Sequence, residues 1–286
     1  MNAAEPLPLQ WEINGLKLAG LSWGKPGDRP LLALHGWLDN AASFSLLAPL
    51  MTGYHVVALD LTGHGHSDPR SPDATYQIWD DLPEILGVVD AMAWDNFSLV
   101  GHSRGAIISS LFASAFPERV GRLVLMEAVG PQPVPEQQFP QQMRKFLLDK
   151  QRLMQQATRV FPNVEDAVSS RRNGGLHAAA AQLLVERNLR PCADGFSWTT
   201  DPRLRGASAV KLTVGQNRAV LESLAAPTLL LLAEDGLGRQ RELAVSAERH
   251  VGNLITEQVS GGHHFHMETN VAAVARRLTH FLEDAK

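Results

Sequence analysis

The sequence predicts an α/β fold, in which a mostly parallel sheet carries helices on both faces. Two observations support this prediction. Short apolar runs alternate with longer segments whose apolar residues recur at helical spacing, and this alternation is typical of β-α-β units. In addition, a Gly-x-Ser-x-Gly segment at residues 101–105 lies between an apolar run and a helical segment, as in a strand–turn–helix connection that carries a reactive serine.

The first half of the chain contains most of the expected sheet. Residues 7–13 and 16–23 are expected to form an antiparallel strand pair, because Asn14-Gly15 between them is a strong hairpin dipeptide. Further strands are expected at 31–34, 55–59, 97–100 and 122–126. Helices are expected at 76–93 and from the residue after Ser103 to about residue 116. Ser43 is expected to cap a short helix that runs to residue 50.

The alternation breaks at residue 131. No convincing strand is found from there to about residue 222, and helices are expected at 138–158, 164–171 and 176–188, followed by a loop that contains Cys192. Strands resume at 227–233 and 255–259, and a helix at 271–282 closes the chain. The sequence therefore predicts a core made of residues 1–130 and 223–286, interrupted by a helical cap at 131–222.

Composition and charge restrict the class of protein. The chain of 286 residues is 44% hydrophobic and 20% charged, with a formal net charge of -4 and scattered basic residues, so no nucleic-acid partner is expected. Residues 1–10 lack the pattern of a signal peptide, and no apolar run approaches the roughly 18 residues of a membrane span. The single cysteine, Cys192, excludes an internal disulfide and favours a reducing compartment. A cytoplasmic protein is expected.

The serine of the Gly-x-Ser-x-Gly segment is the predicted nucleophile. Ser103 would stand in a sharp turn at the carboxyl end of a strand, with its hydroxyl clear of the sheet. Gly101 and Gly105 lack a Cβ and let the strand and the helix approach closely. The alternative interpretation is a glycine-rich connection without chemistry.

A serine hydroxyl needs a base to take its proton and a carboxylate to orient that base. His263 follows the last predicted strand and two glycines, and is the predicted base, with His264 as the fallback; His266 is expected to pack or to hydrogen-bond locally. Glu127 and Asp235 each follow a predicted strand, and either could be the acid. No metal is expected at the three histidines, because closely spaced histidines in such a loop rarely converge on one ion.

The remaining site residues follow from these turns. The backbone N–H groups of Trp37 and Arg104 are expected to hold the oxyanion, because one follows the turn after an early strand and the other follows the nucleophile. The residues expected to contact substrate are Gly36, His102, Phe196 and Trp198. The guanidinium of Arg104 either faces the pocket, where it would favour an anionic acyl or alcohol group, or pairs with a nearby acid.

The segment 63–68 is rich in glycine but lacks the spacing of a dinucleotide fingerprint, and no helix starts within it. It is interpreted as a tight loop at the carboxyl edge of the sheet. Asp60, His64 and Asp68 are expected to brace this loop rather than to react.

Taken together, these motifs resemble the α/β-hydrolase superfamily, and within it the serine hydrolase-like proteins. The residues that carry the resemblance are HGWLDN at 35–40, DLTGHGHS at 60–67, GHSRG at 101–105 and GHHFHME at 262–268. The resemblance implies an eight-stranded core, a hydrolase that acts through an acyl-enzyme, Ser103 as nucleophile and His263 as base.

The acid departs from the pattern of the superfamily. Most members carry it three residues after a strand-end glycine, but here Ala233 stands at the glycine position and Gly236 stands where the acid would be. The segment 125–128 resembles that of some haloalkane dehalogenases whose acid corresponds to Glu127, so Glu127 is favoured over Asp235. The dehalogenase reaction itself is excluded, because it needs an aspartate at the position of Ser103.

The predicted function is hydrolysis of a carboxylic ester or a related acyl bond. No cofactor is required, the expected partner is a small-molecule acyl substrate, and a homodimer is left open as an assembly. Two alternatives remain: a ligand-binding protein that kept the fold without turnover, and the same triad used for acyl transfer, thioester cleavage or C–C bond hydrolysis.

Overall fold

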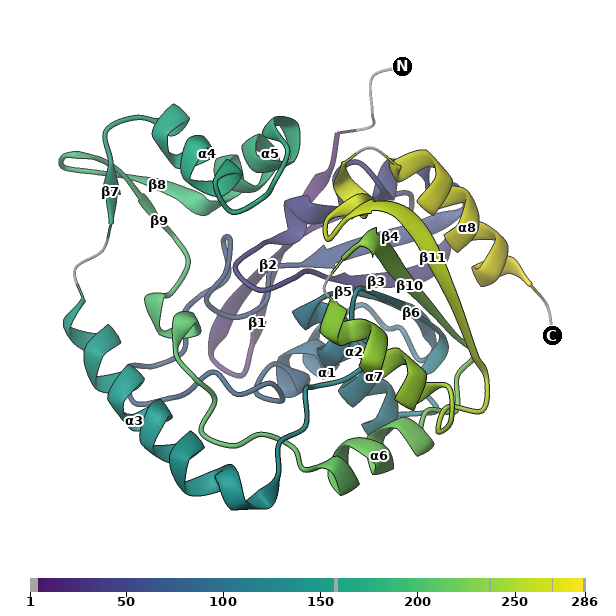
Figure 1. Ribbon diagram of the computed structural model, residues 1–286. Helices are drawn as coiled ribbons and strands as arrows, with labels where there is room; N and C mark the ends of the chain where they lie inside the picture. The colour runs from purple at the N-terminus through teal and green to yellow at the C-terminus, as the bar shows by residue number, and fades with distance from the viewer. Residues whose placement is uncertain (1–4, 157–158, 237, 269, 285–286) are drawn as a thin grey trace.

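The computed structural model describes residues 5–156, 159–236, 238–268 and 270–284, and its centre is one eight-stranded sheet (Figure 1). The strand order is β1-β2-β4-β3-β5-β6-β10-β11. The strands are β1 (Leu7–Ile13), β2 (Leu16–Trp23), β3 (Arg29–Leu34), β4 (Tyr54–Leu59), β5 (Phe97–His102), β6 (Val120–Met126), β10 (Thr228–Asp235) and β11 (Leu254–Gly262). The predicted fold class and the predicted number of strands are thereby confirmed.

All strands from β4 to β11 in this order run parallel, and only β2 runs antiparallel to its two neighbours, β1 and β4. The hairpin turns at Asn14 and Gly15, whose φ angles of 53° and 77° are those of the mirror-image turns that suit the twist of a hairpin. The predicted strand pair is therefore confirmed at both strands.

Side chains alternate between the two faces of the sheet and build two separate cores. In β3, Leu32 and Leu34 enter the core covered by four helices, whereas Leu31 and Ala33 enter the core on the opposite face. The four helices are α1 (Leu82–Ala91), α2 (Arg104–Ala115), α6 (Val214–Glu222) and α7 (Gly238–Ala247). The opposite face is covered by the 3-10 turns η1 (Ala41–Phe44) and η2 (Ala48–Leu50) and by α8 (Val271–Glu283).

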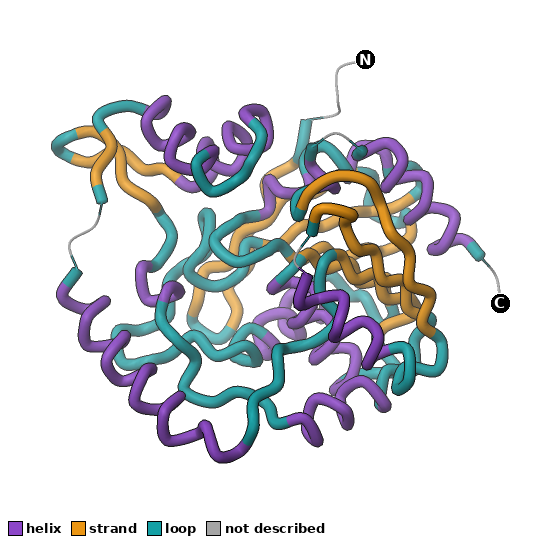
Figure 2. The backbone as a smooth tube through the Cα atoms, in the orientation of Figure 1, coloured by secondary structure: helices purple, strands orange, loops and turns teal. Residues whose placement is uncertain are grey.

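The segment between β6 and β10 adds no strand to the large sheet in the described ranges, but it is not purely helical. Its helices are α3 (Phe139–Gln155), α4 (Val164–Arg172) and α5 (Ala178–Asn188), preceded by the turn η3 (Glu136–Gln138) and followed by η4 (Pro202–Arg205) and α6. Three short strands, β7 (Val160–Phe161), β8 (Leu189–Cys192) and β9 (Gly195–Trp198), form a second sheet in the order β7-β9-β8 (Figure 2).

The expectation of a loop around Cys192 was therefore wrong. Strands of two to four residues are too short for an alternating pattern to be recognised in the sequence. The division into core and cap at residues 131 and 222 stays a prediction. Part of the expected helix 138–158 lies outside the described residues.

Two expected helix starts also differ from the structure. The helix expected from residue 76 begins only at Leu82, because Asp80 accepts a hydrogen bond from the Gln77 N–H and holds the preceding residues in a turn. The turn η1 is capped by Asn40 instead of Ser43. Helices α6 and α7 were not expected. None of the helices in the described ranges combines the length and the apolar character needed to cross a membrane.

Candidate active site

The register of the parallel strands brings the predicted site residues to one edge of the sheet. His102 of β5 pairs with Met126 of β6, and Met126 pairs with Leu231 of β10. Ser103 directly follows His102, and Glu127 directly follows Met126, so the two residues lie at neighbouring places on adjacent strands. On the other side, Asp235 of β10 pairs with Gly262 of β11, and His263 follows directly.

The backbone at Ser103 is held in a conformation that L-residues rarely adopt. Its φ is 51° and its ψ is -113°, and α2 begins at the next residue. A Cβ on Gly101 would lie 2.5 Å from Ala106 Cα, and a Cβ on Gly105 would lie 2.1 Å from the carbonyl oxygen of Leu34. Only glycine fits at both positions, so the two glycines make the sharp turn at Ser103 feasible.

The carboxylate of Glu127 contacts the ring of His263. Glu127 Oε2 lies 2.8 Å from His263 Nδ1, and Glu127 Oε1 accepts a hydrogen bond from the Ala233 N–H at 2.6 Å. The Glu127 residue is 1% exposed, and its φ of 65° turns the chain sharply after β6. This arrangement fixes the carboxylate from two directions and orients the imidazole through Nδ1, which leaves Nε2 for proton transfer.

Asp235 does not take part in this contact. It is exposed at the end of β10, and the described residues offer its carboxylate no hydrogen bond or ion pair. The neighbouring Gly236 explains the departure from the superfamily pattern, because a Cβ there would lie 2.5 Å from Glu127 Oε2. Glu127 fills the space that a side chain at position 236 would need.

Ser103 and His263 line one cavity of about 540 Å³, which we call the catalytic cavity. In the described part of the chain, the Ser103 hydroxyl makes no direct hydrogen bond to His263; such bonds often tighten only when substrate binds. The expected residues Gly36, Trp37, His102 and Arg104 also line this cavity. Trp198 lines a neighbouring cavity, and Phe196 lines neither of these two within the described residues.

Two backbone N–H groups at the catalytic cavity are without a protein acceptor. Within the residues that the structure describes, neither the Trp37 nor the Arg104 N–H donates a hydrogen bond, although both residues border the cavity. Arg104 is the first residue of α2, where backbone N–H groups lack partners inside the helix. These two groups are free to receive a developing negative charge.

Three imidazoles meet beside Ser103. One ligand atom from each of His102, His263 and His264 lies within 4.8 Å of the others, and we call this group the histidine cluster. His102 is fully buried and its Nε2 lies 2.9 Å from the His263 carbonyl oxygen. Burial and the neighbouring histidines lower the pKa of His102 well below its usual range, so this ring is neutral. The cluster has the ligand types and the spacing to hold a divalent transition metal.

His266 does not belong to the histidine cluster. It is buried, and its Nε2 lies 2.8 Å from Ser43 Oγ, as expected for a local hydrogen bond. Burial, followed by the nearby His264, lowers the pKa of His266 to about 3.

The side chain of Arg104 turns toward an acid. Its Nη2 lies 3.5 Å from Asp81 Oδ2 and donates to the Gln77 carbonyl oxygen at 3.4 Å. Of the two alternatives for Arg104, the geometry matches the pairing with a nearby acid.

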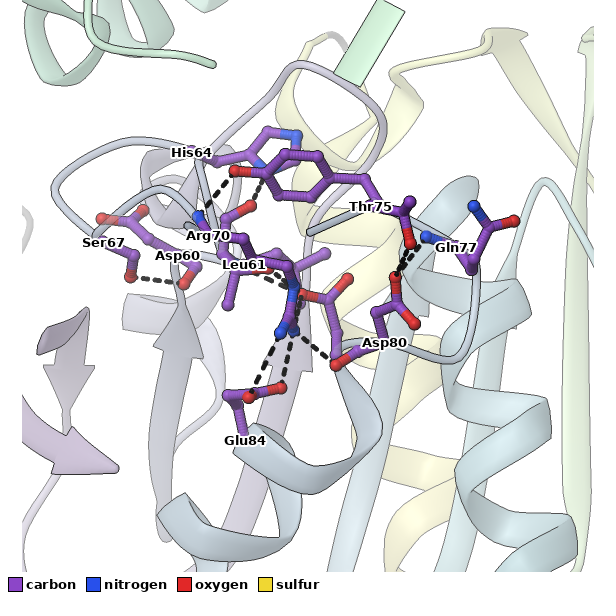
Figure 3. Close-up of polar contacts among 12 residues, drawn as sticks. Asp60, Leu61, His64, Ser67, Arg70, Thr75, Gln77, Asp80 and Glu84 are labelled. Atoms are coloured by element: carbon purple, nitrogen blue, oxygen red, sulfur yellow. Dashed lines mark hydrogen bonds and ion pairs between the residues drawn. The ribbon is translucent and has the colours of Figure 1, made fainter. Parts of the chain in front are cut away.

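The loop that contains residues 63–68 is braced by polar contacts, as expected (Figure 3). The Asp60 carboxylate accepts hydrogen bonds from the Ala41 and His66 N–H groups at 2.7 and 2.9 Å. The backbone carbonyl oxygen of Asp60 accepts a hydrogen bond from Ser67 Oγ at 2.6 Å. Asp68 accepts from the Lys17 N–H at 2.9 Å. Asp60 and Asp68 therefore hold this loop in place.

Sequence reasoning gave no role to Asp39 and Arg171. Asp39 is buried between His264, whose Nε2 lies 3.3 Å from Asp39 Oδ2, and the guanidinium of Arg171 on α4. Burial alone would raise the pKa of Asp39, but His264, Arg171 and His102 together hold it well below its usual range. The HGWLDN motif drew attention to the segment, but no local signal pointed to a partner 132 residues further along the chain.

The fold agrees with comparison to known proteins. The model of the α/β-hydrolase fold family matches residues 29–270, and the chain belongs to this family. The chain is similar to a serine hydrolase-like protein of Danio rerio, with 31% identity over 97% of this chain and 87% of the relative.

Two solved structures are similar over nearly the whole chain. A hypothetical protein of Pseudomonas aeruginosa PAO1 has 36% identity and a TM-score of 0.90, with 98% of this chain and 100% of that chain covered. A thioesterase domain from the curacin biosynthetic pathway has 26% identity and a TM-score of 0.83, with 96% and 99% covered.

Proposed function

We propose that this protein is a serine hydrolase that cleaves a carboxylic ester or a related acyl bond of a small-molecule substrate. The observation that carries the proposal is the contact between His263 Nδ1 and the buried Glu127 carboxylate, beside a serine in a strained turn on the same cavity. Strained backbone, a buried acid and an oriented imidazole in one cavity are the parts that nucleophilic acyl transfer needs.

In the first half of the reaction, Ser103 Oγ attacks the carbonyl carbon and its proton moves to His263 Nε2. The Trp37 and Arg104 N–H groups hold the oxygen of the tetrahedral intermediate. When the bond to the leaving group breaks, His263 gives its proton to that group, and the acyl-enzyme remains. Water then attacks with His263 as the base, and the carboxylic acid leaves with Ser103 restored.

We assign residues 131–222 as a cap that shapes the substrate pocket. Four residues of this segment, Ser170, Arg171, Gly174 and Leu176, line the catalytic cavity together with the core. The similarity to a thioesterase domain makes a thioester one of the acyl bonds to test.

The test combines labelling with turnover. A fluorophosphonate should label the wild type with one equivalent at Ser103, and Ser103→Ala should keep its melting temperature while losing turnover of p-nitrophenyl butyrate and of butyryl-N-acetylcysteamine. Competing alcohols in the assay separate hydrolysis from acyl transfer by the product formed. A folded protein that is neither labelled nor active would instead be a ligand-binding member of the family.

A further inference from the structure

A second cavity of about 360 Å³ adjoins the catalytic cavity. The two share Leu38, Ser170 and Arg171 in their walls, so they lie side by side across these three residues. The residues that line the second cavity are Leu38, Gln156, Arg159, Ser170, Arg171, Asn188, Trp198, Thr200, Pro202 and Arg205.

The charge in this second cavity has one sign. Three of its described lining residues are arginines and none is acidic. Arg171 pairs with Asp39, which lines the catalytic cavity. Arg159 donates to Ser170 Oγ at 3.1 Å and lies over the ring of Phe161, so its charge has no opposite charge in these contacts.

Arg205 differs from the other two arginines, because it has no polar partner among the described residues. Arg205 is exposed in the wall of this cavity, and its guanidinium makes no hydrogen bond or ion pair with any of the described residues. Partial desolvation, and then the like charges of Arg171 and Arg159, lower the pKa of Arg205. Because the arginines repel one another, an anion placed between them would relieve this repulsion and accept hydrogen bonds from unpaired donors.

Two neutral side chains of the cavity already form hydrogen bonds within the protein. Thr200 Oγ1 donates to Asn188 Oδ1 at 3.1 Å, and Asn188 Nδ2 donates to the Leu38 carbonyl oxygen at 3.4 Å. Gln156, Ser170 and Trp198 offer further neutral donors, and the guanidinium groups offer charged ones, which favour planar recognition of carboxylate and phosphate.

We propose that the second cavity binds a carboxylate or phosphate group that the acyl substrate carries away from its scissile bond. The proposal rests on the proposed function and narrows its substrate class to anionic acyl compounds. Arg205 and Arg159 would contact the anion, and Arg171 would stand where the two cavities meet.

Binding without turnover gives the first test. Calorimetric titration uses coenzyme A as the phosphate probe and glutarate as the carboxylate probe. We expect at least one of them to bind the wild type, and Arg205→Gln to weaken that binding about tenfold or more, since hydrogen bonds to charged groups are stronger than neutral ones. Arg205→Lys, which keeps the charge, should retain part of the affinity.

Arg172→Gln is the matched control. Arg172 is an exposed arginine next to Arg171 on α4, and it lines neither cavity, so the variant loses the same charge without touching the proposed site. It should bind both probes as the wild type does. Failure of both probes to bind the wild type, or equal affinity in Arg205→Gln and Arg172→Gln, would overturn the proposal.

Kinetics separate this proposal from the one on which it rests. Arg205→Gln should lower kcat/KM for the monoanion mono-p-nitrophenyl glutarate about tenfold, mainly through KM, and leave kcat/KM for neutral p-nitrophenyl butyrate unchanged. Equal effects on the two esters would reject the anion site and keep the hydrolase. Probe binding that depends on Arg205, in a protein that turns over no ester, would reject the hydrolase and keep the anion site.

Discussion

The choice between Glu127 and Asp235 can be tested with one pair of isosteric substitutions. In the wild type, Glu127 Oε1 accepts from the Ala233 N–H and Oε2 contacts His263 Nδ1. A glutamine has one acceptor oxygen and one donor amide. If its oxygen keeps the Ala233 bond, its NH2 group must face His263 Nδ1. That nitrogen then has to accept, and the ring proton moves to Nε2.

A proton on Nε2 blocks the first step, because Nε2 must accept the proton of Ser103. The opposite orientation of the amide places two donors, its NH2 group and the Ala233 N–H, against each other. In the serine proteases this loss of the correct tautomer costs about 10⁴-fold in kcat, and we expect about 10³- to 10⁴-fold for Glu127→Gln. At 1.36 kcal/mol for each tenfold change, this is about 4–5 kcal/mol of transition-state stabilisation.

The assay is steady-state hydrolysis of p-nitrophenyl butyrate, with kcat and KM measured separately. KM should change only a few-fold, because Glu127 lies behind His263 and is 1% exposed. Asp235→Asn is the control, and its kcat should stay within about twofold, since its exposed carboxylate forms no hydrogen bond or ion pair with the described residues. Glu127→Gln that keeps more than a tenth of the wild-type kcat, or an equal loss in Asp235→Asn, would refute the reasoning.

Three further outcomes are expected. Gly236→Ala should lower kcat at least tenfold, because its Cβ would lie 2.5–2.6 Å from the Glu127 carboxylate oxygens; Gly215→Ala, whose Cβ would meet nothing within 4 Å, should not. The pKa of His266 is about 3 in the fold and about 6.5 in the unfolded chain, so stability should fall below pH 6.5, by about 2 kcal/mol at pH 5 in urea unfolding. A urea midpoint that is the same at pH 6.5 and pH 5 would contradict this. Micromolar Zn²⁺ should inhibit ester hydrolysis through the histidine cluster, with recovery on EDTA; inhibition unchanged in His264→Gln would place the metal elsewhere.

The elements that the sequence predicted well are those with a local signal. Asn14-Gly15 fixed the first hairpin, and the apolar runs of the central strands marked the sheet, because buried parallel strands are apolar on both faces. The turn at Ser103 was also predictable, since glycine must stand at 101 and 105 to let β5 and α2 approach.

The parts that were not predictable depend on contacts between distant segments. Two carboxylates followed strands, and only the fold decides that Glu127 and not Asp235 contacts His263. Two signals for this stood in the sequence: the glycine at position 236, and the resemblance of segment 125–128 to that of some haloalkane dehalogenases. The pairing of Asp39 with Arg171 depends on how α4 packs over the core, which no local pattern encodes.

The position of Glu127 after β6 also affects which segments of the chain can vary in sequence. Ser103 and Glu127 both directly follow one pair of neighbouring positions on β5 and β6, where His102 pairs with Met126. Their mutual placement is therefore set by the pairing of two inner strands of the large sheet. Because Glu127 contacts His263, the connection after β10 need not supply that carboxylate. It needs only the glycine at 236, which leaves room for the Glu127 side chain. Insertions and substitutions after Gly236 should therefore be tolerated in related sequences without loss of activity.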